Sequence, residues 1–308
     1  MHRAQPIYCQ TVYLSKNPHE VDTLNAQTII VTRPAGQARQ LIEQLTASLK
    51  SEGLVKLGQQ GLPQILSLPL LTIIPKGAEP GSSEIDPLAD QIVTILKDAD
   101  LAIFVSPNAI ECTMRLLGRS WQEFSNRRIP IGVMGGSSRA TLQHHGIGLE
   151  EIPTTIFLPE NNAHWDSEGL WQELQSLHWN WSERKVVIFK GEGGRDWLAD
   201  TLATAGATVH AISVYARVPL SIASPTWEAV RKMDFSQSLW LLTSSEAVRY
   251  LGDVIKDEFA QTLLSASAIC SHQNIGEAAK MIGFGKVLIC EPGDEGLIKA
   301  SQVWLSLN

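Results

Sequence analysis

The stretch Val186-Val-Ile-Phe-Lys190-Gly-Glu-Gly-Gly-Arg195-Asp-Trp-Leu198 contains the signals from which the fold class is predicted. Its apolar run Val186–Phe189 is typical of a buried β-strand, and the glycine-rich turn Lys190–Arg195 follows at once. Asp196–Ala205 then has the apolar spacing of a helix, and Gly206 fits the position after a helix, where glycine often takes a left-handed conformation. A strand, a tight turn and a helix in this order are typical of a parallel sheet covered by helices.

The same order of signals recurs along the chain. Gln37–Leu49 and Asn108–Leu117 are further predicted helices. Gln64–Ile74 is apolar but contains Pro69, which cannot donate to a central ladder, so this segment is predicted at a sheet edge or in an interdomain connection. The other predicted strands are Thr28–Val31, Ala102–Val105, Ile131–Met134, Val209–Val218, Leu239–Leu242, Ala268–Cys270 and Lys286–Cys290.

Two parts of the chain resemble each other. Ala102–Ile110 is similar to Trp240–Val248, and Ile30–Gly36 is similar to Ile188–Gly194. Two related α/β halves are the economical explanation. Such a protein is expected to bind its ligand between the halves, at the carboxyl ends of the strands.

Composition excludes several classes of function. The 308 residues, 44% hydrophobic and 19% charged, predict one large or two medium globular domains. A net charge of −7 argues against a nucleic-acid partner. No apolar run is long enough to span a membrane, and the first 26 residues lack the apolar core of a secretory signal, so we expect a cytoplasmic protein. The four cysteines lack zinc or redox spacing, so no metal site is predicted.

Small or hydroxylated residues follow the predicted strands just before helices. Each such group alone is most simply an N-cap. Together they present free backbone N–H groups and hydroxyls at one edge, which suits a ligand carrying several carboxylates or phosphates. The groups are Thr32-Arg33-Pro34, Ser106-Pro-Asn108, Gly135-Gly-Ser-Ser138, Gly191-Glu-Gly-Gly194, Thr243-Ser-Ser245 and Ser271-His272-Gln-Asn274.

Four side chains near these groups leave two interpretations open. Tyr215 is either a core ring or a hydrogen-bond or proton donor in a cleft. Arg217 and Arg195 either bind anions or lie on the surface, and His272 is a candidate for ligand contact.

The ordered set of motifs resembles the uroporphyrinogen-III synthase family over about residues 28 to 301. The individual matches depart from the family pattern at Val105, Met134, Ser138 and Lys190. The matching segments are Thr32–Pro34 with Gln37, Pro69, Val105–Ile110, Met134–Arg139, Ser167–Leu170, Lys190–Leu198, Tyr215–Arg217, Thr243–Val248, and His272 with Ile275 and Gly283.

The resemblance implies two related parallel-sheet α/β lobes joined by a two-stranded connection, with the active site in the cleft between them. Residues 28–71 with 217–308 would form the first lobe, and 72–216 the second. Gln64–Ile74 and Val209–Val218 would be the two crossing strands. Residues 1–27 are an N-terminal extension without a family counterpart, and we assign it no role.

The resemblance also implies an activity. Hydroxymethylbilane, a linear tetrapyrrole with eight carboxylates, would be cyclised to uroporphyrinogen III with loss of water and inversion of ring D through a spiro intermediate. No cofactor is implied, and the expected protein is a monomer that takes its substrate from hydroxymethylbilane synthase. Tyr215 is the expected catalytic acid. The expected substrate-binding residues are Thr32, Arg33, Ser106, Asn108, Gly135, Ser138, Lys190, Gly191, Arg195, Thr243, Ser244, His272 and Ile275.

Two other functions are compatible with the residues. The first is a non-catalytic sensor that binds an anionic metabolite between two lobes. The second is a sugar-phosphate enzyme that uses Thr243–Ser245 as a phosphate-binding nest, for which Glu246 is the local candidate base.

Overall fold

The computed structural model describes residues 27–51, 63–77, 86–124, 129–150, 153–161, 164–255 and 262–307. Its strands are β1 (Thr28–Val31), β2 (Gln64–Ser67), β3 (Leu71–Pro75), β4 (Leu101–Phe104), β5 (Ile131–Val133), β6 (Ile156–Phe157), β7 (Lys185–Gly191), β8 (Thr208–Pro219), β9 (Ser238–Leu242), β10 (Ser267–Cys270) and β11 (Lys286–Ile289). Its α-helices are α1 (Ala35–Ser51), α2 (Pro87–Leu96), α3 (Pro107–Leu117), α4 (Trp121–Phe124), α5 (Gly136–His144), α6 (Ser167–Gln175), α7 (Trp197–Thr204), α8 (Thr226–Lys232), α9 (Ser245–Ile255), α10 (Gln273–Met281) and α11 (Asp294–Leu307). Every strand predicted from the sequence is present, which confirms the predicted α/β class.

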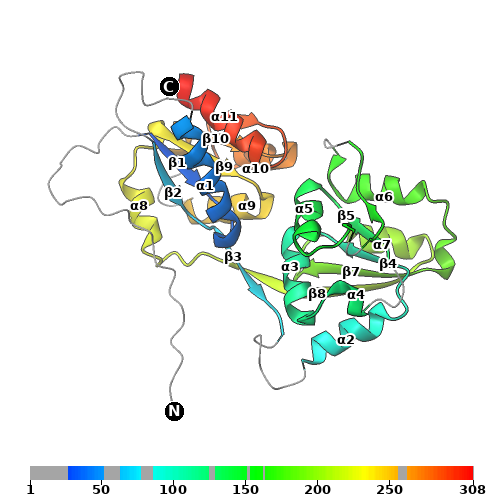
Figure 1. Ribbon diagram of the computed structural model, residues 1–308. Helices are drawn as coiled ribbons and strands as arrows, with labels where there is room; N and C mark the ends of the chain where they lie inside the picture. The colour runs from blue at the N-terminus through cyan, green and yellow to red at the C-terminus, as the bar shows by residue number, and fades with distance from the viewer. Residues whose placement is uncertain are drawn as a thin grey trace, which may run out of the picture.

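The strands form two separate sheets. One has the order β11-β10-β9-β1-β2 and is parallel throughout. The other has the order β3-β8-β7-β4-β5-β6 and is parallel except for β3, which runs antiparallel to β8 at its edge. Figure 1 shows the two sheets in separate bodies. We call the body around β1 the β1 lobe and the body around β7 the β7 lobe.

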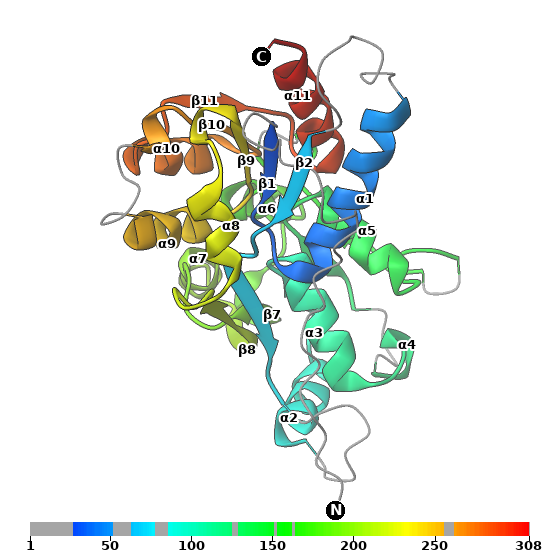
Figure 2. The same ribbon diagram turned by 90° about the vertical axis from the view of Figure 1, so that its left-hand side faces the viewer.

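Helices cover both faces of each sheet. In β1 the side chains of Ile29 and Val31 pack with α1 and α11, whereas Ile30 packs with the core under α8, α9 and α10. This alternation follows from the two-residue period of a strand. Figure 2 shows α1 and α11 on one side of this sheet and α8 to α10 on the other. In the β7 lobe, Phe104 packs with the core under α2, α3 and α5, and Ile103 packs with α6 and α7.

The two sheets repeat one strand order. Reading β8-β7-β4-β5-β6 against β2-β1-β9-β10-β11 pairs each strand of one lobe with a strand of the other. This order places the similar segments Ala102–Ile110 and Trp240–Val248 at equivalent positions, and likewise Ile30–Gly36 and Ile188–Gly194. The predicted internal repeat is therefore confirmed at the level of topology.

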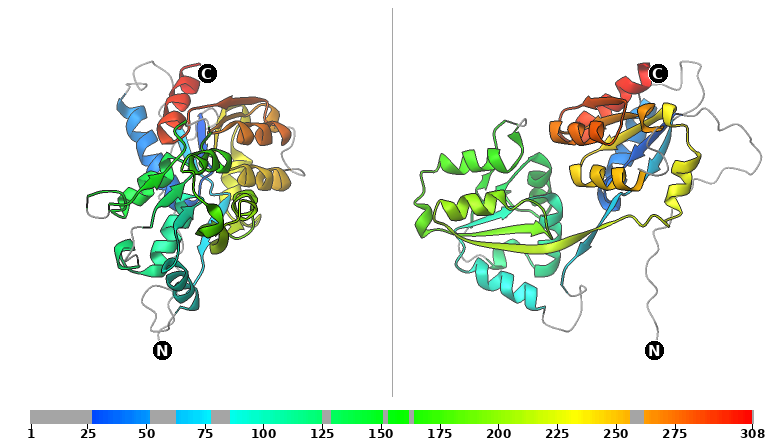
Figure 3. Two further views of the ribbon diagram at one scale, coloured as in Figure 1. Left: turned by 90° about the vertical axis from the view of Figure 1, so that its right-hand side faces the viewer. Right: turned by 180° about the vertical axis from the view of Figure 1, so that it is seen from behind.

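Two chain segments join the lobes, and Figure 3 shows them running between the two bodies. β2 lies at the edge of one sheet and β3 at the edge of the other, with Pro69 between them. The amides of Leu68 and Leu70 still donate to the carbonyls of Val31 and Thr32, while Pro69 has no N–H to donate. The predicted place of Pro69 in a crossing segment is confirmed.

We propose that the lobes divide as residues 28–71 with 217–308 and residues 72–216. The membership of the two sheets supports this division to within a few residues, since β8 continues through Arg217 to Pro219 as a strand of the β7-lobe sheet. The N-terminal extension and most of the predicted loop Gly77–Asp86 lie outside the described residues. The sequence prediction missed β6, because two residues are too few to give a periodic signal. Within the described ranges, no helix has the length and apolarity needed to cross a bilayer.

Candidate active site

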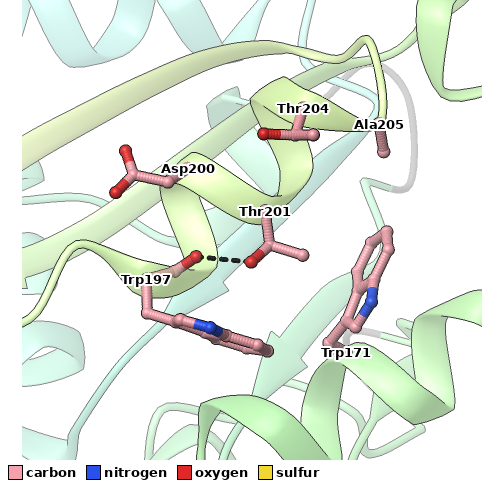
Figure 4. Close-up of a pocket in the computed structure, with 6 residues that line it drawn as sticks. All are labelled: Trp171, Trp197, Asp200, Thr201, Thr204 and Ala205. Carbon is pink, nitrogen blue, oxygen red and sulfur yellow. Dashed lines mark hydrogen bonds between the residues drawn. The ribbon is translucent and has the colours of Figure 1, made fainter.

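Two hollows on the β7 lobe differ in the chemistry of their walls. The one in Figure 4, of about 460 Å³, lies between α6 and α7 and is lined by Trp171, Trp197, Asp200, Thr201, Thr204 and Ala205. The Thr201 hydroxyl there already donates to the Trp197 carbonyl at 2.7 Å, as the dashed line shows. Asp200 is its one charged lining residue, so this hollow lacks the cations that would bind an anionic ligand.

The second hollow, of about 210 Å³, lies where several strands end, and we call it the strand-end pocket. Its lining residues come from β7 and β8, from the segments after β4, β5 and β7, and from the start of α6 and of α7. It is lined by Val105, Ser106, Met134, Ser167, Ile188, Lys190, Gly191, Gly193, Gly194, Arg195, Asp196, Leu198, Ala199, Tyr215 and Arg217. Five residues predicted for the site meet here, namely Ser106, Lys190, Gly191, Arg195 and Tyr215.

Tyr215 lies on β8 with its side chain in the wall of the pocket. The residue is only 2% exposed, and its hydroxyl oxygen is 3.1 Å from the Ser106 hydroxyl oxygen. Ser106 is the N-cap of α3 and accepts from the Ala109 amide at 3.2 Å. The sequence left open whether Tyr215 is a core ring or a polar donor. In the structure it has both properties, because its ring is buried and its hydroxyl contacts Ser106.

The glycines after β7 are required by close approaches and by backbone angles. A β-carbon on Gly191 would lie 2.7 Å from the Tyr215 ring, at the point where the register between β7 and β8 shifts. Gly193 and Gly194 have φ angles of 67° and 84°, a region that other residues adopt only with strain. The loop therefore curves around the pocket.

Three cations in the wall of the strand-end pocket each contact a carboxylate of the protein. Lys190 forms an ion pair with Asp196. An Arg195 Nη2 atom lies 2.5 Å from Glu168 Oε1. Arg217 Nε lies 2.9 Å from Glu246 Oε2. The pocket thus combines a phenol, a serine hydroxyl and three paired cations.

The β1 lobe presents a second set of predicted residues. Arg33 pairs with Asp294, and its Nε donates to the Thr243 hydroxyl at 3.4 Å. Ser244 and His272 act as N-caps: the hydroxyl of Ser244 accepts from the Ala247 amide, and Nδ1 of His272 accepts from the Asn274 amide.

Side-chain contacts connect the two lobes at the starts of helices. Gln37 in the first turn of α1 donates to Asn108 Oδ1 in the first turn of α3, at 3.0 Å. Arg217 reaches Glu246 in the first turn of α9. Because these helices follow directly after strands, the carboxyl ends of the two sheets face each other. This is the arrangement expected from two related halves.

Three predicted binding side chains occupy the framework instead of the pocket. Thr32 is 3% exposed, and its hydroxyl donates to the Leu241 carbonyl at 2.7 Å. Ser138 and Ile275 are also buried. Thr32 directly follows β1, and its buried hydroxyl is satisfied by the neighbouring strand β9. The burial of these three side chains favours a structural role, and their binding of substrate stays a prediction.

Gly135 is an N-cap as expected, but an aromatic ring covers it. A β-carbon on Gly135 would meet the Trp165 indole at 3.2 Å, and one on Gly136 would meet it at 2.5 Å. Trp165 thus covers the two glycines, whereas Trp181 has ring contacts with Trp171 and with Trp179. The sequence signal for this contact is the pair Gly135 and Gly136 at the start of a helix, because two adjacent residues without a β-carbon leave room for an aromatic ring.

The cysteines of the described residues are not suited to act as nucleophiles, and the described residues contain no metal-binding cluster. Burial raises the pKa of Cys112 and of Cys290 to about 11 and that of Cys270 to about 12. These thiols are therefore protonated at neutral pH and are weak nucleophiles. Within the described ranges, no three His, Cys, Asp or Glu side chains gather closely enough to hold a metal ion.

The fold and pocket define a class of protein: two related α/β lobes with polar, cation-bearing strand ends facing each other, suited to a ligand with several negative charges. The family model for uroporphyrinogen-III synthase HemD matches residues 51–299. The chain belongs to the uroporphyrinogen-III synthase family.

Individual relatives agree with this assignment. The chain is 24% identical over 279 residues to the uroporphyrinogen-III synthase of Escherichia coli, covering 89% of this chain and 100% of that protein. It is 24% identical over 287 residues to the Synechococcus elongatus uroporphyrinogen-III synthase, covering 91% and 96%.

Solved structures of the family have the same fold. A mutant uroporphyrinogen III synthase from Thermus thermophilus superposes with a TM-score of 0.55 at 12% identity, covering 92% of this chain and 99% of that one. The uroporphyrinogen-III synthetase of Helicobacter pylori gives 0.53 at 15% identity, covering 90% and 99%. The two-lobed α/β fold expected from the sequence is thereby confirmed.

Proposed function

We propose that this protein cyclises hydroxymethylbilane to uroporphyrinogen III. The observation that carries the proposal is the strand-end pocket, where the buried Tyr215–Ser106 pair lies beside three cations in a chain of this family. A substrate with eight carboxylates needs cations and backbone donors at many points, and both sheets supply them at facing edges. The sensor and sugar-phosphate alternatives have no comparable support.

The reaction begins with departure of the terminal hydroxyl of the bilane. The C–O bond breaks, the hydroxyl leaves as water after receiving a proton, and an azafulvene cation equivalent remains. Ring D attacks this carbon through its substituted position, giving a spiro intermediate that reopens and recloses with ring D inverted, and a proton is lost. The protein is then a hydro-lyase, and the reactivity resides in the substrate, so we propose that it needs neither metal nor organic cofactor.

Tyr215 is the proposed donor of the proton to the leaving hydroxyl. When the Ser106 hydroxyl donates to the phenol oxygen, the phenol proton is free to point toward the substrate. Arg217 lies with its guanidinium carbon 5.7 Å from the centre of the Tyr215 ring, where its positive charge favours charge development on the phenol oxygen. Departure of the hydroxyl is the step that this pair would accelerate.

The remaining proposed role of the protein is to hold the bilane in one folded shape. We propose that the carboxylates of the bilane bind to the cations Arg33, Lys190 and Arg195. Neutral hydrogen-bond donors would come from Asn108, Gly135, Gly191, Thr243, Ser244 and His272. We further propose that the chain acts as a monomer in the cytoplasm and receives the bilane from hydroxymethylbilane synthase.

An isomer assay tests the proposal. Freshly generated hydroxymethylbilane is mixed with the purified chain, and the porphyrins are separated after oxidation. Spontaneous closure gives the type I isomer, so a dominant type III isomer is expected. Type I alone, from a folded protein, would contradict the proposed activity, and calorimetric titration with the porphyrinogen would then test the sensor alternative. Sedimentation of the same sample checks the monomer.

A further inference from the structure

The three cations of the strand-end pocket are each paired with an acidic side chain. Asp196 is the N-cap residue of α7, directly after the glycine-rich loop. Glu168 comes from the first turn of α6, and Glu246 from the first turn of α9 in the other lobe. The three carboxylates thus come from three separate helix starts, and each one pairs with a different cation of the pocket.

These carboxylates remain within reach of solvent. The side chains of Glu168, Glu246 and Asp196 are 38%, 48% and 60% exposed. Lys190 and Arg217 are less exposed, at 15% and 22%, but an ion pair with one solvent-exposed partner still contributes little to folding stability, because water solvates the released carboxylate. A competing carboxylate can therefore take the place of the acidic side chain at small energetic cost.

We propose that Glu168, Asp196 and Glu246 are specificity-determining residues that act as exchangeable counter-ions, which the carboxylates of the substrate displace from Lys190, Arg195 and Arg217. This rests on the proposed function, since it assumes that the bilane binds in this pocket. A small anion exchanges one ion pair for another and gains little. A ligand with many carboxylates displaces several counter-ions in one binding event, so its later contacts form at high effective concentration.

Glu246 is the informative position because Arg217 lies on β8 of the β7 lobe, whereas Glu246 lies in α9, which covers the sheet of the β1 lobe. Its carboxylate holds the place on Arg217 Nε that a substrate carboxylate would take beside Tyr215. Displacing it also releases a contact between the lobes, so that binding and lobe orientation would be linked.

The variant Glu246→Gln keeps the size of the side chain and removes its charge. We expect the KM for hydroxymethylbilane to fall about two- to fivefold with kcat little changed, which is the range that loss of one exposed ion pair allows. Titration calorimetry with glutarate, in the absence of substrate, should show tighter binding by a similar factor. A merely structural role of Glu246 would instead lower the melting temperature and leave both ligand measurements unchanged.

Glu228→Gln is the matched control. Glu228 on α8 is exposed and pairs with Lys232 at 3.9 Å. The variant therefore removes the same charge and one ion pair, but outside the strand-end pocket. If Glu228→Gln lowers KM as much as Glu246→Gln, the effect is one of net charge and the proposal is overturned. An unchanged KM and unchanged glutarate affinity in a folded Glu246→Gln protein would also overturn it.

Glu168→Gln provides a second test if Glu246→Gln fails to fold, with the same expectations through Arg195. The glutarate titration keeps this inference separate from the proposed function. If the wild-type chain forms only type I porphyrin but Glu246→Gln binds glutarate more tightly, the result supports the counter-ion role of Glu246 and contradicts the synthase activity.

Discussion

The ring of Tyr215 packs directly on the α-carbon of Gly191, so that a β-carbon at this position would lie 2.7 Å from Cε2 and 3.0 Å from the phenol oxygen. The first distance is shorter than any normal contact of a β-carbon, and the second is tighter than most. Gly191 thus holds open the space in which the phenol meets Ser106. The requirement for glycine here comes from a neighbouring strand and not from a left-handed backbone.

Gly191→Ala should therefore damage the site more than the fold. The added methyl group must displace a buried ring, and overpacking of this kind costs about 1–3 kcal/mol. We expect a melting temperature lower by several degrees and formation of type III porphyrin reduced to the level of Tyr215→Phe. Gly36→Ala is the control, because its β-carbon would have no neighbour within 4 Å. Full activity in a folded Gly191→Ala protein would contradict the proposed position of Tyr215.

Removing the phenol hydroxyl should impair turnover without abolishing it. Tyr215→Phe leaves the ring and the substrate-binding cations in place, so kcat should fall by about 100-fold while KM changes little, as expected for loss of a general acid. The type III fraction should fall toward the spontaneous type I background. Ser106→Ala should have a smaller effect on kcat, because the phenol keeps its proton. Unchanged turnover in Tyr215→Phe would remove this residue from the mechanism.

Thr32 should matter for stability and not for substrate affinity. Thr32→Val leaves the Leu241 carbonyl without its side-chain partner and should cost about 1–3 kcal/mol, seen as a lower melting temperature with KM unchanged. Thr46→Val is the matched control, since its hydroxyl makes a 2.7 Å bond to the Ile42 carbonyl within α1. That bond is local to one helix, so its loss should cost less. A raised KM in Thr32→Val would restore the binding role predicted from the sequence.

The partly buried thiol of Cys290 predicts a loss of stability at alkaline pH. Burial raises the pKa of Cys290 from 9.0 to about 11, so above pH 9 the unfolded chain releases a proton that the folded chain keeps. The free energy of unfolding contributed by this group is therefore complete below pH 9 and falls as the pH rises toward 11, by at most about 1.4 kcal/mol per unit. Urea denaturation at pH 8 and pH 10 measures the slope. Cys290→Ala should have a shallower slope than the wild-type chain, and equal slopes would contradict the assignment.

Local sequence patterns predicted the strands, the crossing segment and the helix starts correctly. Val186–Phe189 is apolar throughout because β7 is covered on both faces, and Gly206 has a φ angle of 105° because the chain turns there after α7. Such features depend on residues a few positions apart, so a single sequence carries them. The ordered motifs likewise sufficed to assign the family, and they predicted a site at the strand ends.

The partners of the site residues were decided only by the tertiary structure. Arg33 pairs with Asp294, 261 positions away, and Arg217 pairs with Glu246 in α9 of the other lobe. The Thr32 hydroxyl, a candidate for substrate binding by its position, is taken by Leu241 in the adjacent strand. An ion pair or a buried hydrogen bond depends on which strands become neighbours, and strand order is a property of the whole chain. The sequence therefore determined which chemical groups stand at the strand ends, and the packing of the two sheets determined which of them remain available to a ligand.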